Sequence, residues 1–161
     1  MDSRLNSIKD RIRALINRNK QIDTELENNS QESKKEVLNA EKEQNNNEIR
    51  KERSNRYELQ QISEDTEFMK KCCLYLQKLG IVKSQHQFCT EFLNKSQHYL
   101  AMVICENRRP AIDAVHNLVK NLNELYALYE EYNNRESINR SLRGLIDTGQ
   151  GIITRRILKY L

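Results

Sequence analysis

Apolar side chains in the first part of the chain recur in alternating steps of three and four residues, with polar side chains between them. This spacing places them on one stripe of a helix, as in the seam of a coiled coil. Asn19 occupies one seam position, where a polar side chain can define register and helix number at some cost in stability. The pattern predicts a helix that either self-associates or packs on its own chain through Leu5, Ile8, Ile12, Leu15, Asn19, Ile22 and Leu26.

The next stretch, residues 27–56, has few apolar side chains and many charged ones. It begins near NNSQES, which is typical of a helix break, and the apolar seam resumes at Leu59 and Ile62. One arrangement is a helical hairpin in which this stretch returns antiparallel to the first helix. The other is a long, mostly solvated helix, in which charged pairs four residues apart add little stability. Both arrangements make residues 1–65 an arm instead of a compact core.

From Phe68 onward the chain consists of short apolar-rich segments with few residues between them. Their apolar positions follow helical spacing, and four Gly and one Pro leave few places for turns. We therefore expect an all-α protein with a coiled-coil or helical-hairpin arm (1–65), a small helical domain (66–134) and an amphipathic helical tail (135–161). The tail would dock on its own domain, pair with a second subunit or bind an anionic partner, and docking is the simplest arrangement.

The composition favours a cytoplasmic protein without a membrane span. No run of about 18 apolar residues occurs, and the N-terminal residues lack the apolar core of a secretory signal. The four cysteines form no CxxC pair, so we expect reduced side chains that fill small spaces in the core. The net formal charge of +4 lies in the second part of the chain, because residues 1–65 are close to neutral. A basic surplus permits binding to a polyanion but does not require it.

The tetrapeptide KSQH occurs twice, at Lys83–His86 and at Lys95–His98. His98 has no second His, Cys or acid three or four residues away, and Cys89 alone, three residues after His86, does not make a zinc-site pattern, so we predict no metal site and no cofactor. The repeats fit two helix starts better, because Ser84 and Ser96 are good N-cap residues and an apolar face follows each. Two short helices across a short link form a helix-turn-helix, and Pro110 suits the first turn of the next helix.

The segments around these repeats follow one another in a recognisable order. SQHQFC begins at Ser84 with Ser-Gln and two apolar residues in the first turn, and SQHYLAMV begins at Ser96. A basic loop, NRRP, then ends at Pro110 and leads into AIDAVHNLVKNL. Over residues 70–122 this order and spacing resemble the helix-turn-helix domains of the phage-repressor (Cro/XRE-like) superfamily. The resemblance implies a helix-turn-helix fold and DNA binding, by a dimer on paired half-sites.

The resemblance also implies roles for individual residues. Gln85 and the amides that begin its helix would hold a phosphate, and Gln97 and His98 would approach base edges. The basic side chains would contact phosphates, which position a protein without carrying sequence information. The implied DNA-binding residues are Lys83, Gln85, Lys95, Gln97, His98, Arg108 and Arg109.

Three features depart from that pattern. The turn between the two helices lacks the usual Gly. The base-reading helix, HYLAMVIC, is apolar over much of its length, whereas such helices normally present polar side chains to the major groove. Small repressors also have no counterpart of the arm. The last two features favour an alternative: a structural or assembly protein, for example a scaffold or capsid-assembly factor, that binds a protein lattice through its arm.

No motif indicates catalysis. LIDTG at residues 145–149 contains the Asp-Thr-Gly of aspartic proteases, but those enzymes need two such aspartates on β-rich lobes. Neither GxxxxGK(S/T) nor HExxH occurs. We therefore expect a non-enzymatic, cytoplasmic DNA-binding protein, a regulator or nucleoprotein component of a phage or mobile element. Its expected partners are DNA and further copies of itself, with a coat protein or other protein lattice under the alternative.

Overall fold

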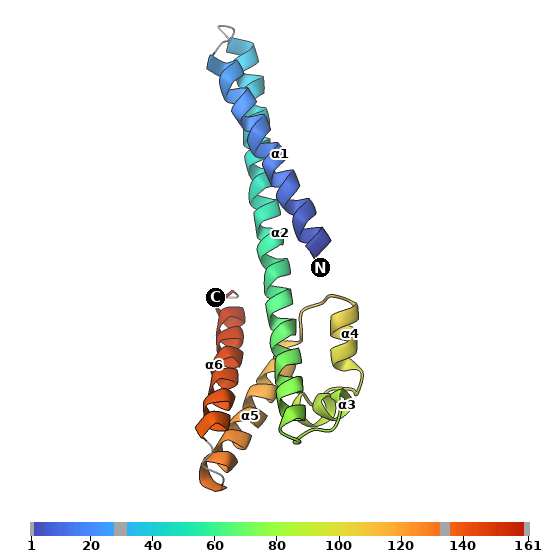
Figure 1. Cartoon of the computed structure of the whole chain (residues 1–161). Coiled ribbons are helices and arrows are strands. Elements are labelled where there is room, and N and C mark those ends of the chain that lie inside the picture. Colours follow the sequence, from blue (N-terminus) through green and yellow to red (C-terminus); the bar gives the residue numbers. More distant parts are fainter. Residues whose placement is uncertain (1, 28–31, 133–135, 160–161) are drawn as a thin grey trace. The chain divides into compact units, whose positions relative to one another are not determined.

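The structure is a computed structural model that describes residues 2–27, 32–132 and 136–159 (Figure 1). In these ranges the regular elements are helices and no strand occurs, which confirms the all-α prediction. The elements are α1 (Asp2–Glu27), α2 (Glu32–Lys78), α3 (Gln85–Gln87), a π-helical turn η1 (Phe88–Phe92), α4 (Tyr99–Cys105), α5 (Ile112–Tyr132) and α6 (Glu136–Leu158).

The chain divides into two compact units, Met1–Gln60 and Gln61–Leu161, and α2 supplies residues to both. None of the helices that the structure describes is long and apolar enough to cross a membrane.

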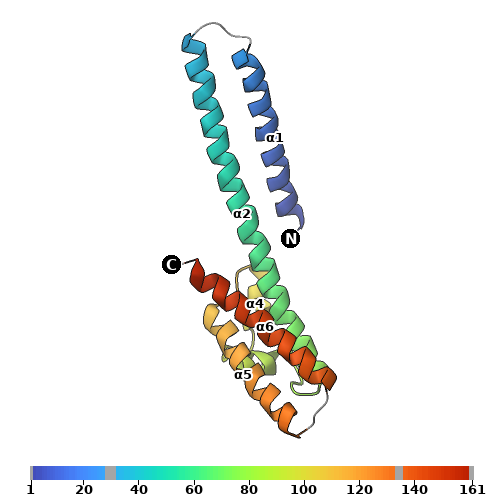
Figure 2. The same cartoon turned by 90° about the vertical axis from the view of Figure 1, so that its left-hand side faces the viewer.

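In the first unit, α1 packs antiparallel against the first part of α2 (Figure 2). The ion pairs between the two helices show this direction, because Arg11 bonds to Glu52 at 2.9 Å and Arg18, two turns later, bonds to Glu41 at 2.7 Å. Of the two arrangements that the sequence allows, the chain adopts the hairpin. The predicted break falls largely on residues 28–31, which lie outside the described residues.

The first unit buries few apolar side chains. Ile8, Ile12 and Ile49 form a small buried cluster, and the hairpin brings Leu59 against it, as expected from the resumed seam. Asn19 lies in a layer of amides, where it donates to Asn46 and accepts from Asn45 at 3.0 Å each.

Most seam residues therefore face α2 of their own chain. Ile22 is fully buried, Leu15 and Leu26 are half-buried, and the side chain of Leu5 lies outside the described residues. Self-association through the seam stays a prediction.

The second unit has an extensive apolar core to which α2, η1, α4, α5 and α6 contribute. α5 and α6 lie side by side in both views (Figures 1 and 2) and close over the end of α2. The fully buried core side chains include Met69, Leu76, Phe88, Leu93, Leu100, Leu118, Leu122 and Leu142.

The C-terminal helix is part of this core. Leu142, Leu145, Ile146 and Ile152 are buried, so α6 docks on the helices of its own unit. Gly149 makes this close packing possible, because a Cβ at that position would overlap with the side chain of Val119 and press on Phe68.

The cysteine prediction holds at three of the four positions. Cys72, Cys73 and Cys89 are buried, and burial raises the pKa of each thiol. For Cys105 the prediction is wrong, because this residue ends α4 on its exposed side. The helical pattern around it, HYLAMVIC, is apolar on both faces and so does not reveal which face is buried.

Candidate nucleic-acid interface

The first KSQH repeat begins a helical segment, as predicted. Ser84 has extended backbone angles, φ −151° and ψ 163°, and its side chain accepts a hydrogen bond from the amide of Gln87 at 3.2 Å. This bond satisfies one of the amides that a helix N-terminus leaves unpaired. From there α3 continues directly into η1, which buries Phe88, Cys89 and Phe92.

A tight link follows η1 and contains a residue with left-handed backbone geometry. Asn94 has φ 53°, a conformation that Asn adopts more readily than other non-glycine residues. The amide of Lys95 then donates to the carbonyl of Cys89 at 2.9 Å and closes the end of the segment. Asn94 therefore does in this turn what Gly commonly does at the end of a helix.

The second KSQH repeat does not begin a helix in the same way, so the prediction for Ser96 is wrong. α4 begins at Tyr99, and the capping position belongs to His98, whose side chain makes no capping bond. Ser96 acts through its backbone instead, because its carbonyl accepts from the amide of Tyr99 at 2.9 Å in a turn that precedes the helix.

The two helical segments share one core. Phe88, Cys89 and Leu93 of the first segment and Leu100 and Val103 of α4 are all buried to within about one percent of full burial. This shared packing holds the two segments against each other.

Two asparagines on α5 hold the end of η1, and sequence analysis did not identify them. Asn117 donates to the carbonyl of Leu93 at 3.1 Å, and Asn121 donates to that of Phe92 at 3.0 Å. They lie one turn apart in AIDAVHNLVKNL, where polar residues beside an apolar stripe were the available signal.

The two repeats bring their histidines together. The rings of His86 and His98 meet edge to face with centroids 5.0 Å apart, and both residues are exposed. Gln97 lies beside them, with its amide nitrogen 3.0 Å from Nε2 of His98. Among the described residues, no group of three or more His, Cys, Asp or Glu side chains has the arrangement to hold a metal ion.

The basic side chains predicted to contact phosphate lie in different settings. Lys83 is exposed at the start of α3, where Gln85 is half-buried. Lys95 pairs with Asp113 at 2.6 Å, and this lysine lowers the pKa of the Asp113 carboxyl through a hydrogen bond. Arg108 is exposed and pairs with Glu106 at 3.2 Å.

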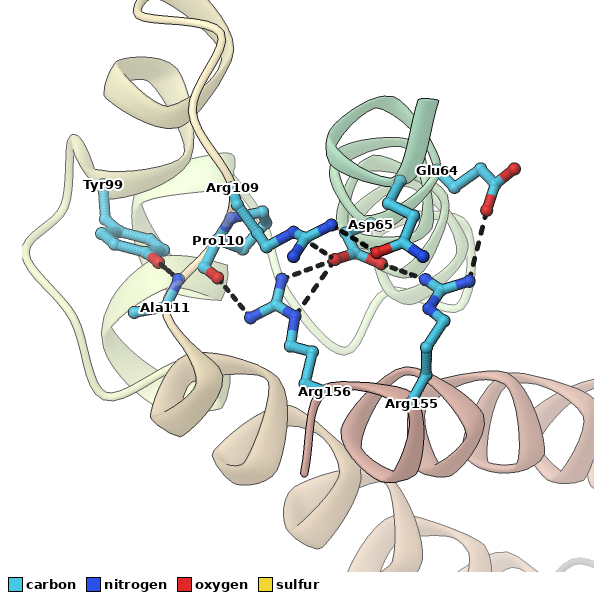
Figure 3. Close-up of polar contacts among 9 residues, drawn as sticks. Glu64, Asp65, Tyr99, Arg109, Pro110, Ala111, Arg155 and Arg156 are labelled. Carbon is cyan, nitrogen blue, oxygen red and sulfur yellow. Dashed lines mark hydrogen bonds and ion pairs between the residues drawn. The ribbon is translucent and has the colours of Figure 1, made fainter. Parts of the chain in front are cut away.

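Arg109, next to Arg108 in sequence, lies in a different environment. Its Nε is 3.4 Å from a carboxylate oxygen of Asp65, and its terminal nitrogen donates to Gln61 at 2.7 Å. Figure 3 shows its guanidinium among the groups that surround Asp65. Both partners are on α2, so we assign Arg109 to the interior of the unit and leave it out of the candidate interface.

The candidate interface therefore consists of exposed or half-buried polar residues around α3, before the start of α4 and in the loop after α4: Lys83, Gln85, Lys95, Gln97, His98 and Arg108. Beyond Tyr99 the exposed side of α4 is apolar, with Met102 and Ile104 about two-fifths exposed.

The fold and this surface define an all-helical protein whose second unit contains two short helical segments on a shared core. A family model that matches residues 69–157 shows that the chain belongs to DUF6626, a family of unknown function. The matched residues include all of α3, η1, α4 and α5 and exclude the first unit. No curated protein and no solved structure matches the chain.

Proposed function

We propose that the second unit binds double-stranded DNA through the candidate interface, as a non-enzymatic regulator or nucleoprotein component of a phage or mobile element. The observation that carries this proposal is the pair of helical segments joined by the Asn94 turn, with exposed or half-buried polar residues of a KSQH repeat at the start of each. In the phage-repressor domains that the sequence resembles, these positions face DNA.

The polar residues of the candidate interface would contact different parts of the DNA. Gln97 and His98 precede α4 and have side chains that can hydrogen-bond to base edges in the major groove. Lys83, Lys95 and Arg108 would contact phosphates. The partners of Lys95 and Arg108 are themselves more than half exposed, and exposed ion pairs are weak, so a phosphate can replace these carboxylates.

A charge-matched pair of variants tests this proposal. Lys83→Ala with Arg108→Ala removes two charges from the interface, and Lys120→Ala with Arg143→Ala removes two exposed charges from α5 and α6. Affinity for a random-sequence duplex would be measured by fluorescence anisotropy over a range of salt concentrations, with helix content checked by circular dichroism.

The interface variant should bind more weakly and lose about 0.9 from the slope of log K against log salt for each phosphate contact removed. The control variant should bind like the unaltered chain. Equal losses in both variants would show binding without a defined interface, and no binding by the unaltered chain at low salt would refute the proposal.

A second candidate function is assembly on a protein partner, and the apolar exposed side of α4 favours it. A base-reading helix gains little from Met102 and Ile104 beyond contacts to thymine methyl groups. In a protein interface the same side chains would be desolvated core residues. Where that partner is a further copy of this chain, changing both to Gln should lower the native mass, whereas the DNA-binding proposal leaves the mass unchanged.

Self-association through the arm belongs to both proposals. A second hairpin would have to pack on α1 and α2 beside the small cluster that they already share. Native mass of the full chain, measured over a hundredfold range of concentration, tests it, and a monomer throughout would refute it.

A further inference from the structure

In the loop between α4 and α5, residues Asn107–Ala111, three amides are held by carbonyl groups of α4 or by the hydroxyl of Tyr99. Asn107 has φ 48° and its amide donates to the carbonyl of Ile104, while the amide of Arg108 donates to the carbonyl of Val103 at 3.1 Å. The amide of Ala111 donates to the hydroxyl of Tyr99 at 2.6 Å. A loop held in this way has little freedom to lose when it binds a ligand.

Residues distant in sequence complete the fixation of this loop. Arg156 of α6 donates to the carbonyl of Pro110 at 2.6 Å, and through Nε and its other terminal nitrogen it bonds to the carboxylate of Asp65 (Figure 3). Both Arg156 and Pro110 are buried. The loop is therefore fastened to α6 directly and to α2 through Asp65.

The charges explain why this connection is rigid. Asp65 is fully buried, and a buried carboxylate is tolerated only when cations and hydrogen bonds compensate it. Arg109, Arg155 and Arg156 surround it, and arginine does not lose its proton in proteins. If the Arg156 guanidinium moved away, both the carbonyl of Pro110 and the carboxylate of Asp65 would lose buried hydrogen bonds.

Arg108 lies between the fastened residues but takes no part in this network. Its side chain is 46% exposed, and its ion-pair partner, Glu106, is 54% exposed. The adjacent Arg109 and Pro110 are held from the interior, so the backbone that carries Arg108 is fixed while its guanidinium meets solvent.

We infer that Asp65 and Arg156 are positioning residues that hold Arg108 ready to contact a DNA phosphate. This inference rests on the proposed function and extends it, because it assigns a role in binding to α6 and to residues outside the two helical segments. Both Arg155 and Arg156 bond to Asp65, but of the two only Arg156 also donates to the loop, at the carbonyl of Pro110.

The test compares Arg156→Lys with Arg155→Lys in the full chain. Both variants keep the positive charge beside Asp65, but lysine lacks the forked guanidinium that reaches two acceptors at once. Tyr99→Phe is a second loop variant, because it removes only the hydroxyl that holds Ala111. Each is measured alone and combined with Arg108→Ala, using a random-sequence duplex and the salt titration, with thermal unfolding as the check on folding.

Loss of the Arg108 phosphate contact should weaken binding about tenfold and reduce the salt slope by about one. Arg156→Lys should reproduce much of both effects and add nothing to Arg108→Ala. Tyr99→Phe should act in the same direction and Arg155→Lys should bind within about twofold of the unaltered chain, which amounts to a few tenths of a kcal/mol.

Other outcomes overturn the inference. Equal losses in the Arg156 and Arg155 variants would indicate a general stability effect, and effects that multiply with Arg108→Ala would show independent action. If Arg156→Lys fails to fold, an unchanged salt slope for Tyr99→Phe still overturns it. Binding by the unaltered chain with any of these results leaves the proposed function standing, whereas absence of binding by that chain overturns both.

Discussion

The two units of this chain are both helical but are stabilised in different ways. The first unit is a hairpin with four buried isoleucines, a layer of asparagines and exposed ion pairs. The second encloses a large apolar core and a network of arginines around the fully buried carboxylate of Asp65. Exposed ion pairs contribute at most about 1 kcal/mol each, so most of the stability must come from the second unit. Precise positioning of functional groups is accordingly expected there.

The largest effect should come from the core of the second unit. Phe88→Ala empties a fully buried site and should lower the free energy of unfolding by about 3–5 kcal/mol. Ile12→Ala in the hairpin should cost about 2 kcal/mol, the low end for such changes, because the small cluster can relax around it. Denaturant unfolding followed by circular dichroism measures both, and a larger loss for Ile12→Ala would contradict the comparison.

A comparable effect should follow from removing the buried carboxylate. Asp65→Ala leaves the arginines around it without compensation and should cost about 3–5 kcal/mol. Glu64→Ala is a matched control on the next residue, where a half-exposed carboxylate pairs with Arg155 and its loss should cost less than about 1 kcal/mol. Chemical denaturation provides the measurement, and similar losses for the two variants would show that burial of the charge is unimportant.

A smaller effect is expected from the asparagine layer of the hairpin. Asn19→Ala removes two side-chain hydrogen bonds and should cost about 1–2 kcal/mol. Asn17, an exposed residue of the same helix, is the matched control, and Asn17→Ala should stay within about 0.5 kcal/mol. Hydrogen exchange of the α1 amides is the readout, and equal exchange in the two variants would show that the asparagine layer does not stabilise the hairpin.

The two KSQH repeats make a comparison within the second unit. Ser84→Ala removes an N-cap bond and should destabilise the protein by about 1 kcal/mol, whereas Ser96→Ala should change its stability by less than about 0.5 kcal/mol. Thermal unfolding of both variants under one set of conditions measures the difference. The reverse order would show that Ser96 is the capping residue.

The smallest effect concerns an exposed ion pair. The pKa of Asp113 is lowered by Lys95, so the pair adds stability above the ordinary carboxyl pKa of 3.8 and loses it as the pH falls through the lowered value. Asp113→Asn should therefore cost a few tenths of a kcal/mol, about the size of other exposed pairs, at neutral pH and nothing in strong acid. Unfolding at both pH values measures this, and Asp147→Asn, at another exposed aspartate, is the control.

Local patterns in the sequence predicted much of this fold. The seam spacing identified Ile8, Ile12 and Ile22 as buried, and Leu59 as the point where the stripe resumes. It did not identify the partner, because a stripe has the same spacing whether it packs on its own chain or on another. The Ser84 cap was also predictable from local sequence, because capping depends on neighbours within three residues.

The candidate interface was less accessible to such arguments. Arg108 and Arg109 are adjacent and chemically identical, yet only Arg109 turns inward, where it contacts Asp65 and Gln61. Both partners lie more than forty residues away in sequence, so the local pattern does not distinguish the two arginines. The link to Arg156 crosses a similar distance. Asn94 adopts the turn geometry expected of Gly, which composition alone does not reveal. Long-range contacts of this kind leave no periodic signal in a single sequence.

The central claim is that the second unit binds DNA, and the most direct test is a salt titration of the unaltered chain with a labelled random-sequence duplex. We predict binding at low salt that weakens steeply as salt rises, with a slope that falls by about one when Arg108 is changed to Ala. Absence of binding at the lowest salt concentration, by a chain that is folded and of defined native mass, would contradict the claim and favour a protein partner.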